Sequence, residues 1–398
     1  MFSQLESQPA DALLAVMAAF AADPSSEKLD LGVGVYRDES GVTPVMRAVR
    51  EAEAELLTAQ KTKAYVGPAG NRPFADFIET LTLGDHPARR AGRVVTLQTP
   101  GGCGALRLAA DLINRAARGT RIAMSDPTWA NHVPLLSGAG LVVDTYPYYD
   151  AQTSSVSFEP MLETLKRLPA GAVVLLHGAC HNPTGADLSL DQWQVLAGLL
   201  ETRGLVPLID IAYQGLGEGL DHDAAGLRLL AQQLPELLIA VSCSKNFGLY
   251  RERVGAIIAI GESPSQASIL MSHLQALARR MYSMSPDHGA AIVAAIGASS
   301  LLSAEWRVEL DIMRERVARI RHAVTQALNR ELQSERFDFI AAQRGMFSVL
   351  GLDSQAVSRL RSEHHVYLAN DSRMNLAGLP ESAVGHFAGA LAKVIHSG

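Results

Sequence analysis

The segment from 242 to 255 (SCSKNFGLYRERVG) places a lysine and two arginines close together. Lys245 comes just after an apolar run that predicts a buried strand, and Arg251 and Arg253 follow it by six and eight residues. A lysine at the carboxyl edge of a sheet can be desolvated, and its amine then becomes a nucleophile able to form a Schiff base. Most lysines are solvated instead, so the spacing alone leaves a nucleophile and an ordinary turn lysine as alternatives.

Two more polar residues stand near the ends of apolar runs. Asp210 ends the run 206–210 (VPLID), and Asn182 lies beyond the run 172–176 (AVVLL). A carboxylate at such a place either caps a helix or pairs with a buried cation, because an unpaired buried charge is costly. Side chains at the carboxyl ends of strands in an open α/β sheet converge on a ligand crevice. We therefore expect Asn182, Asp210 and Lys245 to meet in one crevice.

A glycine-rich segment and a histidine–cysteine pattern are less specific. Residues 99–107 (TPGGCGALR) open a helix after a strand, so their small side chains either admit a phosphate to the helix N-terminus or serve packing. His177, Cys180 and His181 have the spacing H-x-x-C-H, but no second ligand cluster accompanies them, so loop packing is favoured and no metal is predicted. Neither a complete G-x-G-x-x-G nor a P-loop pattern occurs.

Short β-rich runs alternate with helical segments between residues 94 and 260. Continuous apolar runs are typical of strands that are buried on both faces of a mostly parallel sheet. The pattern predicts an α/β fold whose large domain holds a doubly wound, mostly parallel sheet of about seven strands. Its strands are expected at 94–98, 121–125, 142–148, 172–177, 206–211, 238–242 and 254–260, and its helices at 105–117, 129–137, 160–167 and 190–202.

The last third of the chain has a different pattern, in which strands are followed by helices. Such an order predicts a smaller α+β domain. Pro9 and the apolar residues 12–22 predict an N-terminal amphipathic helix that packs on this domain. We expect a long charged helix at about 304–332, strands at 337–341, 346–350, 366–368 and 374–376, and a closing helix after Pro380.

The composition excludes several classes of protein. The 398 residues include 35 Lys and Arg against 41 Asp and Glu, a net charge of −6 that argues against a nucleic-acid partner. Three scattered cysteines argue against a disulfide scaffold and favour a reducing compartment. No basic residue precedes Lys28, and no apolar stretch is long enough for a membrane span. We therefore expect a cytoplasmic protein with no membrane partner.

Several motifs in a fixed order resemble those of a known enzyme family. The segments 181–185 (HNPTG), 210–215 (DIAYQG) and 242–255 resemble the class I, fold-type I pyridoxal-phosphate aminotransferases, in their aspartate and aromatic amino-acid branch. The resemblance extends from 31–37 (LGVGVYR) to 371–378 (DSRMNLAG), which is nearly the whole chain. It implies an N-terminal segment 1–44 packed with the small domain, a large cofactor-binding domain 45–310 and a small domain 311–398.

The resemblance implies a role for each matching residue at the cofactor, pyridoxal 5'-phosphate. Lys245 would bind the cofactor covalently and move a proton at the substrate carbon, and Asp210 would keep the pyridine nitrogen protonated. Tyr213 and Asn182 would donate hydrogen bonds to the phenolic oxygen. Trp129, otherwise a core tryptophan, would stack on the ring. The residues expected at the phosphate are Gly102, Cys103, Ser242, Arg253 and, from a partner subunit, Tyr65.

Cys103 departs from the family pattern, which often has a hydroxyl residue at this position. A thiol is a weaker hydrogen-bond donor than a hydroxyl. One hydrogen bond to the phosphate is therefore expected to be lost or to pass through a water molecule.

Substrate recognition also follows from the resemblance. Arg373 would bind the α-carboxylate with both nitrogens of its fork, with Gly34, Trp129 and Asn182 contacting the same substrate. Arg279 would come from the partner subunit of a homodimer and pair with a second carboxylate. Arg280 is the alternative register for that role.

The implied reaction moves an amino group from aspartate, glutamate or an aromatic L-amino acid to a 2-oxo acid such as 2-oxoglutarate. Met284, Ala64 and Cys103 differ from polar residues common in strict aspartate enzymes, and they favour the dual specificity. One alternative is a carbon–sulfur lyase or another non-transaminating enzyme of the same fold. The other is a cofactor-binding regulator, which would need a DNA-binding module in the 33 residues before Gly34.

Overall fold

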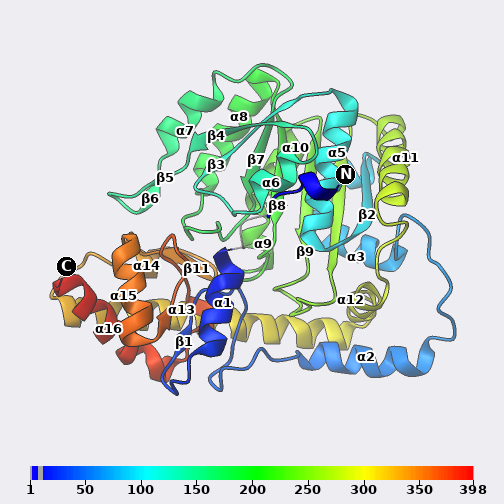
Figure 1. The fold of residues 1–398 in the computed structure, drawn as a ribbon. Coiled ribbons are helices and arrows are strands. Elements are labelled where there is room, and N and C mark those ends of the chain that lie inside the picture. Colours follow the sequence, from blue (N-terminus) through cyan, green and yellow to red (C-terminus); the bar gives the residue numbers. More distant parts are fainter. Residues whose placement is uncertain (1, 8–11, 398) are drawn as a thin grey trace. The chain divides into compact units, whose positions relative to one another are not determined.

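The computed structural model describes residues 2–7 and 12–397 (Figure 1). The chain forms two compact units, a larger one of residues 44–315 and a smaller one of the residues up to 43 and from 316 onward. The predicted divisions were 44/45 and 310/311, and the second division in the structure falls within the long helix α13 (Ser300–Leu332). Pro9, expected near the start of the first helix, lies outside the described residues.

A seven-stranded sheet is the centre of the larger unit, in the order β2-β10-β9-β8-β7-β3-β4. Strand β10 runs antiparallel to both of its neighbours, β2 and β9, and the other neighbouring pairs are parallel. The predicted α/β fold with a mostly parallel sheet is confirmed. The strands are β2 (Val94–Pro100), β3 (Arg121–Asp126), β4 (Val142–Pro147), β7 (Val173–His177), β8 (Val206–Ile211), β9 (Leu237–Ser242) and β10 (Val254–Ile260).

Apolar side chains explain why the central strands form. Every residue of β9 (LLIAVS) and β10 (VGAIIAI) is buried, so these strands are covered on both faces. Leu97 and Ile257 of the sheet pack with Leu106 of α5 (Gly101–Ala116) and Leu274 of α11 (Pro264–Met281). Full burial of one such side chain stabilises a fold by about 1.5–3 kcal/mol. The packed sheet therefore gives the residues at its strand ends fixed positions.

Helix α5 begins at Gly101, four residues before the predicted start at 105. Its first turn contains glycines because the backbone there passes too close to neighbouring residues to leave room for a Cβ atom. The other elements of the larger unit are α2 (Arg47–Ala59), α3 (Arg72–Leu83), α4 (Pro87–Arg90), α6 (His132–Ser137), β5 (Tyr149–Asp150), β6 (Ser155–Val156), α7 (Phe158–Leu165), α8 (Leu190–Arg203), α9 (Leu220–Asp223), α10 (Ala225–Gln233) and α12 (His288–Ala298).

The smaller unit combines helices with two pairs of short strands, in which β1 pairs with β12 and β11 pairs with β13. The strand predicted at 337–341 is wrong, because this segment contains the helical turn α14 (Phe339–Ala342). Phe337 and Ile340, three residues apart, are both buried, which is helical rather than alternating spacing. The other elements are η1 (Phe2–Gln4), α1 (Ala12–Ala22), β1 (Leu29–Asp30), β11 (Phe347–Val349), α15 (Ser354–His364), β12 (Val366–Tyr367), β13 (Arg373–Asn375), η2 (Leu376–Gly378), η3 (Glu381–Ala383) and α16 (Val384–His396).

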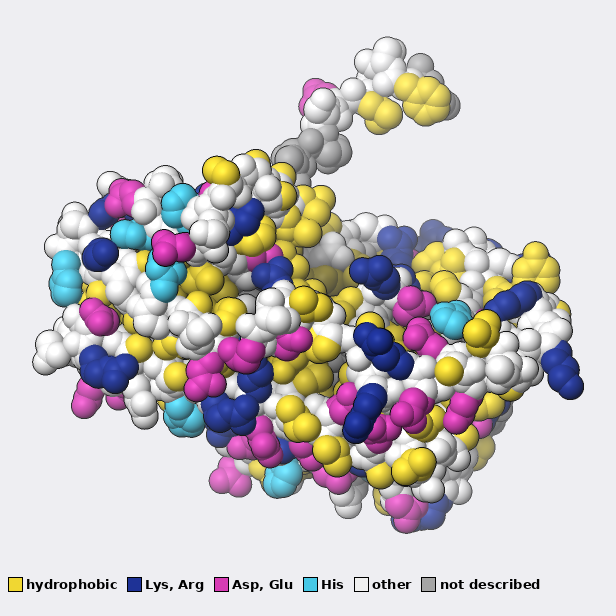
Figure 2. Space-filling view, turned by 90° about the horizontal axis from the view of Figure 1, so that it is seen from below, with side chains coloured by type: hydrophobic (Ala, Val, Ile, Leu, Met, Phe, Trp, Pro, Cys, Tyr) yellow, Lys and Arg dark blue, Asp and Glu magenta, His cyan; other side chains and the backbone are white. Residues whose placement is uncertain are grey.

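Basic and acidic side chains are intermixed on the face that Figure 2 presents, in keeping with the nearly balanced charge of the chain. Within residues 2–7 and 12–397, no single helix is long and apolar enough to cross a membrane. The helices α12 and α13 satisfy that test only as a pair, and the chain bends by 105° between them.

The fully buried Trp306 of α13 supports the segment that follows β9. Its indole ring stacks on Phe247 with ring centres 4.4 Å apart and an interplanar angle of 1°. Its Nε1–H donates to the carbonyl oxygen of Asn246 at 2.7 Å. Because Asn246 and Phe247 directly follow Lys245, this contact fixes the backbone next to the lysine.

We expect Trp306→Ala to destabilise the protein by about 3–5 kcal/mol, because the change empties a closed site and leaves a buried carbonyl without its donor. Urea unfolding followed by circular dichroism measures the loss. Trp306→Phe is the matched control, since it keeps an aromatic ring against Phe247 and is expected to lose less. Equal stability of Trp306→Ala and the native protein would contradict this account of the segment.

Candidate active site

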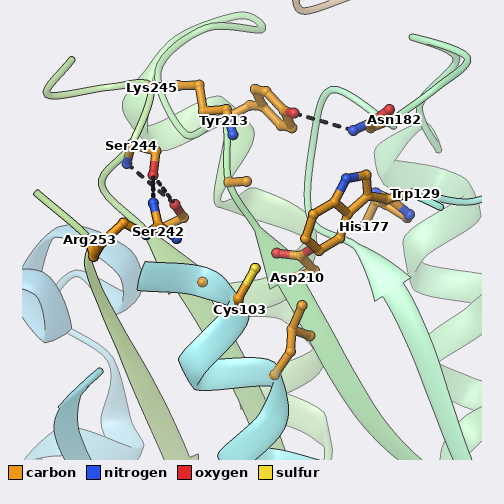
Figure 3. A pocket seen from close by; sticks show the side chains of 13 residues that line it. Cys103, Trp129, His177, Asn182, Asp210, Tyr213, Ser242, Ser244, Lys245 and Arg253 are labelled. Atoms are coloured by element: carbon orange, nitrogen blue, oxygen red, sulfur yellow. Dashed lines mark hydrogen bonds between the residues drawn. The ribbon is translucent and has the colours of Figure 1, made fainter. Parts of the chain in front are cut away.

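A cavity of about 240 Å³ lies at the carboxyl ends of β7, β8 and β9, beside the first turn of α5 (Figure 3). Parallel strands that end at one edge bring their last residues together, which is why polar residues far apart in sequence meet here. Nine of the residues predicted at the cofactor line the cavity, namely Gly102, Cys103, Trp129, Asn182, Asp210, Tyr213, Ser242, Lys245 and Arg253.

Lys245 stands three residues beyond β9, with its Nζ 5.1 Å from the centre of the Tyr213 ring. Asn182 Nδ2 donates to the Tyr213 hydroxyl at 3.4 Å, and Figure 3 shows the two side chains pointing toward each other. The cavity thus places a primary amine beside a phenol and an amide. These are groups that can bind a carbonyl compound and hydrogen-bond its oxygen atoms.

Asp210 is the acidic residue of the cavity and is 9% exposed. Its Oδ2 lies 3.1 Å from Nε2 of the fully buried His132. Burial raises the pKa of Asp210, but the hydrogen bond from His132 and the positive charges of nearby groups, including Lys245, outweigh burial and hold the pKa below its ordinary value. Asp210 is therefore ionised near neutral pH, and it can hold a cationic nitrogen of a ligand.

The other end of the cavity, the anion cradle, has groups that can hold an anion. Helix α5 presents the N–H groups of its first turn, which have no acceptor within the helix. Ser242 Oγ lies 3.1 Å from Ser244 Oγ, and Arg253 Nη1 lies 3.5 Å from the same Ser244 oxygen. A Cβ atom on Gly101, whose φ is +73°, would lie 2.4 Å from Arg253 Nη2. The glycine therefore allows the helix and the guanidinium to approach one anion.

Cys103 lines this anion cradle and is partly exposed. Asn131 Nδ2 approaches its sulfur at 3.9 Å. The thiol stands where a hydroxyl would give a stronger hydrogen bond. The cradle thus relies on backbone N–H groups, on the two serines and on Arg253.

Three buried or partly buried histidines were not predicted as site residues, namely His177, which lines the cavity, and His132 and His181. Thr128 Oγ1 joins two of them, since it lies 2.8 Å from His132 Nδ1 and 3.1 Å from His177 Nε2. The ring of His177 also contacts the ring of His181, and the two ring centres are 4.1 Å apart. Burial, with the charge of neighbouring histidines, lowers the pKa of His177 to about 3 and the pKa of His181 well below its ordinary value.

These histidines show how the H-x-x-C-H pattern is used. The ring of His181 stacks on Tyr148 with centres 4.1 Å apart, and its two nitrogens lie 3.0 Å from Ser125 Oγ and 2.9 Å from Thr184 Oγ1. Among the described residues, no group of three or more His, Cys, Asp or Glu side chains is arranged to hold a metal ion. The motif therefore serves hydrogen bonding and packing behind Asp210. Ser244, also missed, could have been found from its place in the S-C-S-K segment.

Two predicted residues of the larger unit do not line this cavity. Tyr65, which is 90% exposed, and Arg279 instead line a second pocket of about 290 Å³ together with Met284. Arg279 donates to the hydroxyl of Ser283 there. The structure thus groups the two residues that the resemblance assigns to a partner subunit, and it does so apart from the lining of the Lys245 cavity.

Gly34 and Arg373 belong to the smaller unit. The guanidinium carbon of Arg373 lies 4.5 Å from the centre of the Phe347 ring, and Nη2 donates to the Gly32 carbonyl at 2.9 Å. A Cβ atom on Gly34 would lie 2.8 Å from Phe347 Cζ, so a larger residue would displace this ring. Asn375 Nδ2 holds the carbonyls on either side of Gly34, those of residues 33 and 35, at 2.6 and 2.7 Å.

The sequence of this chain matches a known protein family over most of its length. Residues 26–391 match the model of the family "Aminotransferase class I and II". The chain belongs to the class I and II aminotransferases. It is 45% identical over 394 residues to an aromatic-amino-acid aminotransferase of Paracoccus denitrificans, covering 99% of this chain and 100% of that one. It is 42% identical over 396 residues to an aspartate aminotransferase of Escherichia coli, with the same shares covered.

A solved structure agrees with these relatives. An aromatic-amino-acid aminotransferase of Burkholderia pseudomallei, covalently bound to pyridoxal phosphate, superposes with a TM-score of 0.97 at 42% identity and with 99% of each chain covered. The resemblance inferred from the motifs is confirmed, and so is the fold class. For this aminotransferase, the observed cavity is therefore the candidate active site.

We expect this aminotransferase to lose stability as the pH falls from about 7 toward 5. In the unfolded chain, His177 and His181 take up protons near the ordinary pKa of about 6.5, whereas the folded protein keeps them neutral to much lower pH. Each could contribute up to about 1.4 kcal/mol per pH unit in that range. Urea unfolding at several pH values measures the slope, and His181→Gln should make it shallower. An unchanged slope in the variant would show that His181 takes up its proton over the same pH range in the folded and in the unfolded chain.

Proposed function

We propose that this chain is a pyridoxal-phosphate-dependent enzyme that transfers the amino group of an L-amino acid to a 2-oxo acid such as 2-oxoglutarate. The observation that carries the proposal is a single cavity that holds an amine, an ionised carboxylate and an anion cradle. Pyridoxal phosphate has a matching aldehyde, pyridine nitrogen and phosphate. The donor set therefore fits this cofactor.

The residues that would hold the cofactor follow from these complementary groups. Lys245 offers the amine for the covalent bond, and Asp210 offers a negative charge for the pyridine nitrogen. Tyr213 and Asn182 offer hydrogen bonds for the phenolic oxygen, and Trp129 offers a ring face. The phosphate would rest on the N–H groups of Gly102 and Cys103 and on the side chains of Ser242 and Arg253. When bound, the cofactor supplies an electron sink that no amino-acid side chain provides.

The protein's own contribution is to place charges and to move a proton. Asp210 keeps a proton on the pyridine nitrogen because its carboxylate stays ionised beside His132. Lys245 Nζ serves as the general base and acid at the substrate α-carbon, a role typically worth about 10²–10⁴-fold in rate. The buried ring of His132 holds Asp210 in place.

Substrate binding would use Arg373 and Gly34 of this chain together with residues of a second subunit. Arg373 would bind the α-carboxylate through two parallel hydrogen bonds, and Gly34 leaves room for the substrate beside it. Arg279 would pair with a second carboxylate and Tyr65 would reach the phosphate, both from the partner of a homodimer. The shared pocket of Tyr65 and Arg279, separate from the lining of the Lys245 cavity, supports this arrangement.

Dual specificity for acidic and aromatic amino acids is proposed on two grounds. Relatives named for aromatic amino acids and for aspartate are similarly close to this chain. Met284, which lines the pocket of Arg279, and Ala64 are apolar where strict aspartate enzymes often have polar residues. We also propose a reducing, cytoplasmic location, in keeping with three cysteines that form no disulfide bond in the described chain.

We expect Lys245→Ala to abolish amino transfer from aspartate and from phenylalanine to 2-oxoglutarate, a loss of at least about 10²–10⁴-fold. Glutamate formation measures the activity, and borohydride treatment followed by mass spectrometry measures the covalent cofactor. Lys166→Ala, which removes a lysine paired with Glu163 on the surface, is the control and should keep both. Substantial amino transfer by Lys245→Ala would contradict the role proposed for Lys245. Release of ammonia by the native enzyme without any 2-oxo acid would contradict the proposed amino transfer.

Arg279→Ala should separate the two kinds of substrate. The loss of a charge-assisted hydrogen bond to the second carboxylate is expected to lower kcat/KM for aspartate by about 10–100-fold. The value for phenylalanine, which has no second carboxylate, should change little. Arg280→Ala is the matched neighbouring control and should affect neither substrate. A larger effect of Arg280→Ala on aspartate would assign the role to that residue instead.

A further inference from the structure

Tyr213 and Asn182 lie on two loops that follow neighbouring strands. Tyr213 stands two residues beyond β8, and Asn182 stands five beyond β7. The hydrogen bond between them, 3.4 Å long, joins the two loops at the cavity. Loops are less rigid than the elements that they connect. Some other contact must therefore hold these two side chains in position.

The loop that carries Tyr213 is wrapped around one buried carboxylate. Asp223, at the end of α9, is 6% exposed and does not line the cavity. Its Oδ2 accepts the N–H groups of Gly215 and Gly217 at 2.8 and 2.9 Å. Its Oδ1 accepts the N–H of Glu218 at 2.7 Å. Burial raises the pKa of Asp223, and these three backbone N–H groups oppose the rise because they stabilise the charged carboxylate.

The two glycines of this loop show how closely it is built around Asp223. A Cβ atom on Gly217 would lie 2.6 Å from Asp223 Oδ1. Gly215 has φ +96°, and a Cβ atom there would lie 2.5 Å from Leu310 Cδ2. The N–H of Leu216 also donates back to the Tyr213 carbonyl at 2.9 Å. The backbone that carries the Tyr213 phenol is thus fixed by hydrogen bonds at Gly215 and Leu216, two and three residues after Tyr213.

The loop that carries Asn182 is held in the same manner by Asp187. The Oδ2 of Asp187 accepts the N–H of Cys180 at 2.7 Å, and its Oδ1 accepts the N–H of His181 at 2.8 Å. Cys180 has φ +55°, an uncommon conformation for a residue other than glycine, so the turn needs such support. His181 directly precedes Asn182. Asp187 therefore fixes the backbone from which the Asn182 amide extends.

We propose that Asp223 and Asp187 are positioning residues, which hold the Tyr213 hydroxyl and the Asn182 amide where both can donate to the phenolic oxygen of the cofactor. The proposal rests on the function proposed above and goes beyond it by assigning two carboxylates outside the cavity. Neither carboxylate lines the cavity, so both act through backbone N–H groups. Their effect is carried by the positions of Tyr213 and Asn182.

The proposal has a spectroscopic consequence. Hydrogen bonds donated to the phenolic oxygen favour its ionised form, so they lower the pH at which the visible absorption of the bound cofactor changes. A displaced Tyr213 raises that pH. Asp223→Asn keeps the size of the side chain but turns one oxygen into a donor that faces a backbone N–H. We expect this variant to shift the absorption midpoint upward by about 0.5–1 pH unit.

The experiment titrates the absorption of the holoenzyme of native protein, Asp223→Asn and Asp187→Asn, and measures the dissociation constant of pyridoxal phosphate for each. Asp221→Asn is the matched control, because Asp221 lies on the same helix, is 83% exposed and pairs only with Arg228 among the ion pairs of the described chain. The control for Asp187→Asn is Asp191→Asn, because Asp191 is an exposed residue on α8, four residues after Asp187. Both controls should keep the native midpoint.

A second series repeats Asp223→Asn in a Tyr213→Phe background. If Asp223 acts by placing the Tyr213 hydroxyl, its substitution shifts the midpoint in the native background and leaves the midpoint unchanged once that hydroxyl is absent. A shift of equal size in both backgrounds would overturn the positioning role. A native midpoint in Asp223→Asn and Asp187→Asn would also overturn it.

The two proposals fail in different ways. If Tyr213→Phe alone leaves the midpoint at its native value, the role proposed for Tyr213 at the cofactor is wrong. If Tyr213→Phe shifts the midpoint and the aspartate variants do not, only the positioning role is wrong. Circular dichroism checks that each variant folds. Should Asp223→Asn not fold, Asp187→Asn decides the question with the same titration in an Asn182→Ala background.

Discussion

An ionised carboxylate buried at the end of β8 is the constraint on which the candidate site depends. Burial opposes the charge of Asp210, and the hydrogen bond from His132 compensates it. His132 in turn needs a partner for its second nitrogen, which Thr128 provides, and Thr128 also contacts His177. The polar groups behind the cavity thus form a connected series. It keeps one negative charge, that of Asp210, at the cavity.

The cavity also separates charges by position. Asp210 lies at one part of it, and the anion cradle of α5 and Arg253 lies at another. Under the proposed function, a ligand that carries a cationic ring nitrogen and a phosphate would be oriented by these two parts before any covalent bond forms. Lys245 lies beside Tyr213 and is held by a backbone that Trp306 fixes from behind. The charged groups of the cavity and the support of the amine thus belong to separate parts of the larger unit.

The sequence predicted those features that depend on local pattern. Continuous apolar runs marked the seven strands, and polar residues after them marked Asn182, Asp210 and Lys245. The roles of Asp187, Asp223 and His132 could not be read in this way, because an aspartate or histidine in a loop looks the same whether it is solvated or bonded to a buried group. The segment 337–341 was misread because a short apolar run fits both a strand and a helical turn.

Because β10 is antiparallel to β2 and β9, it begins at the edge of the sheet where the cavity lies. Val254, the first residue of β10, is paired with Pro100, the last residue of β2, and Gly255 is paired with Ser242 at the end of β9. An antiparallel strand begins at the edge where its parallel neighbours finish. A single short connection therefore brings both Lys245 and Arg253 to the cavity, without a crossover helix between them. Insertions in that connection would change the spacing between the amine and the phosphate cradle, whereas insertions at the opposite edge of the sheet leave it intact.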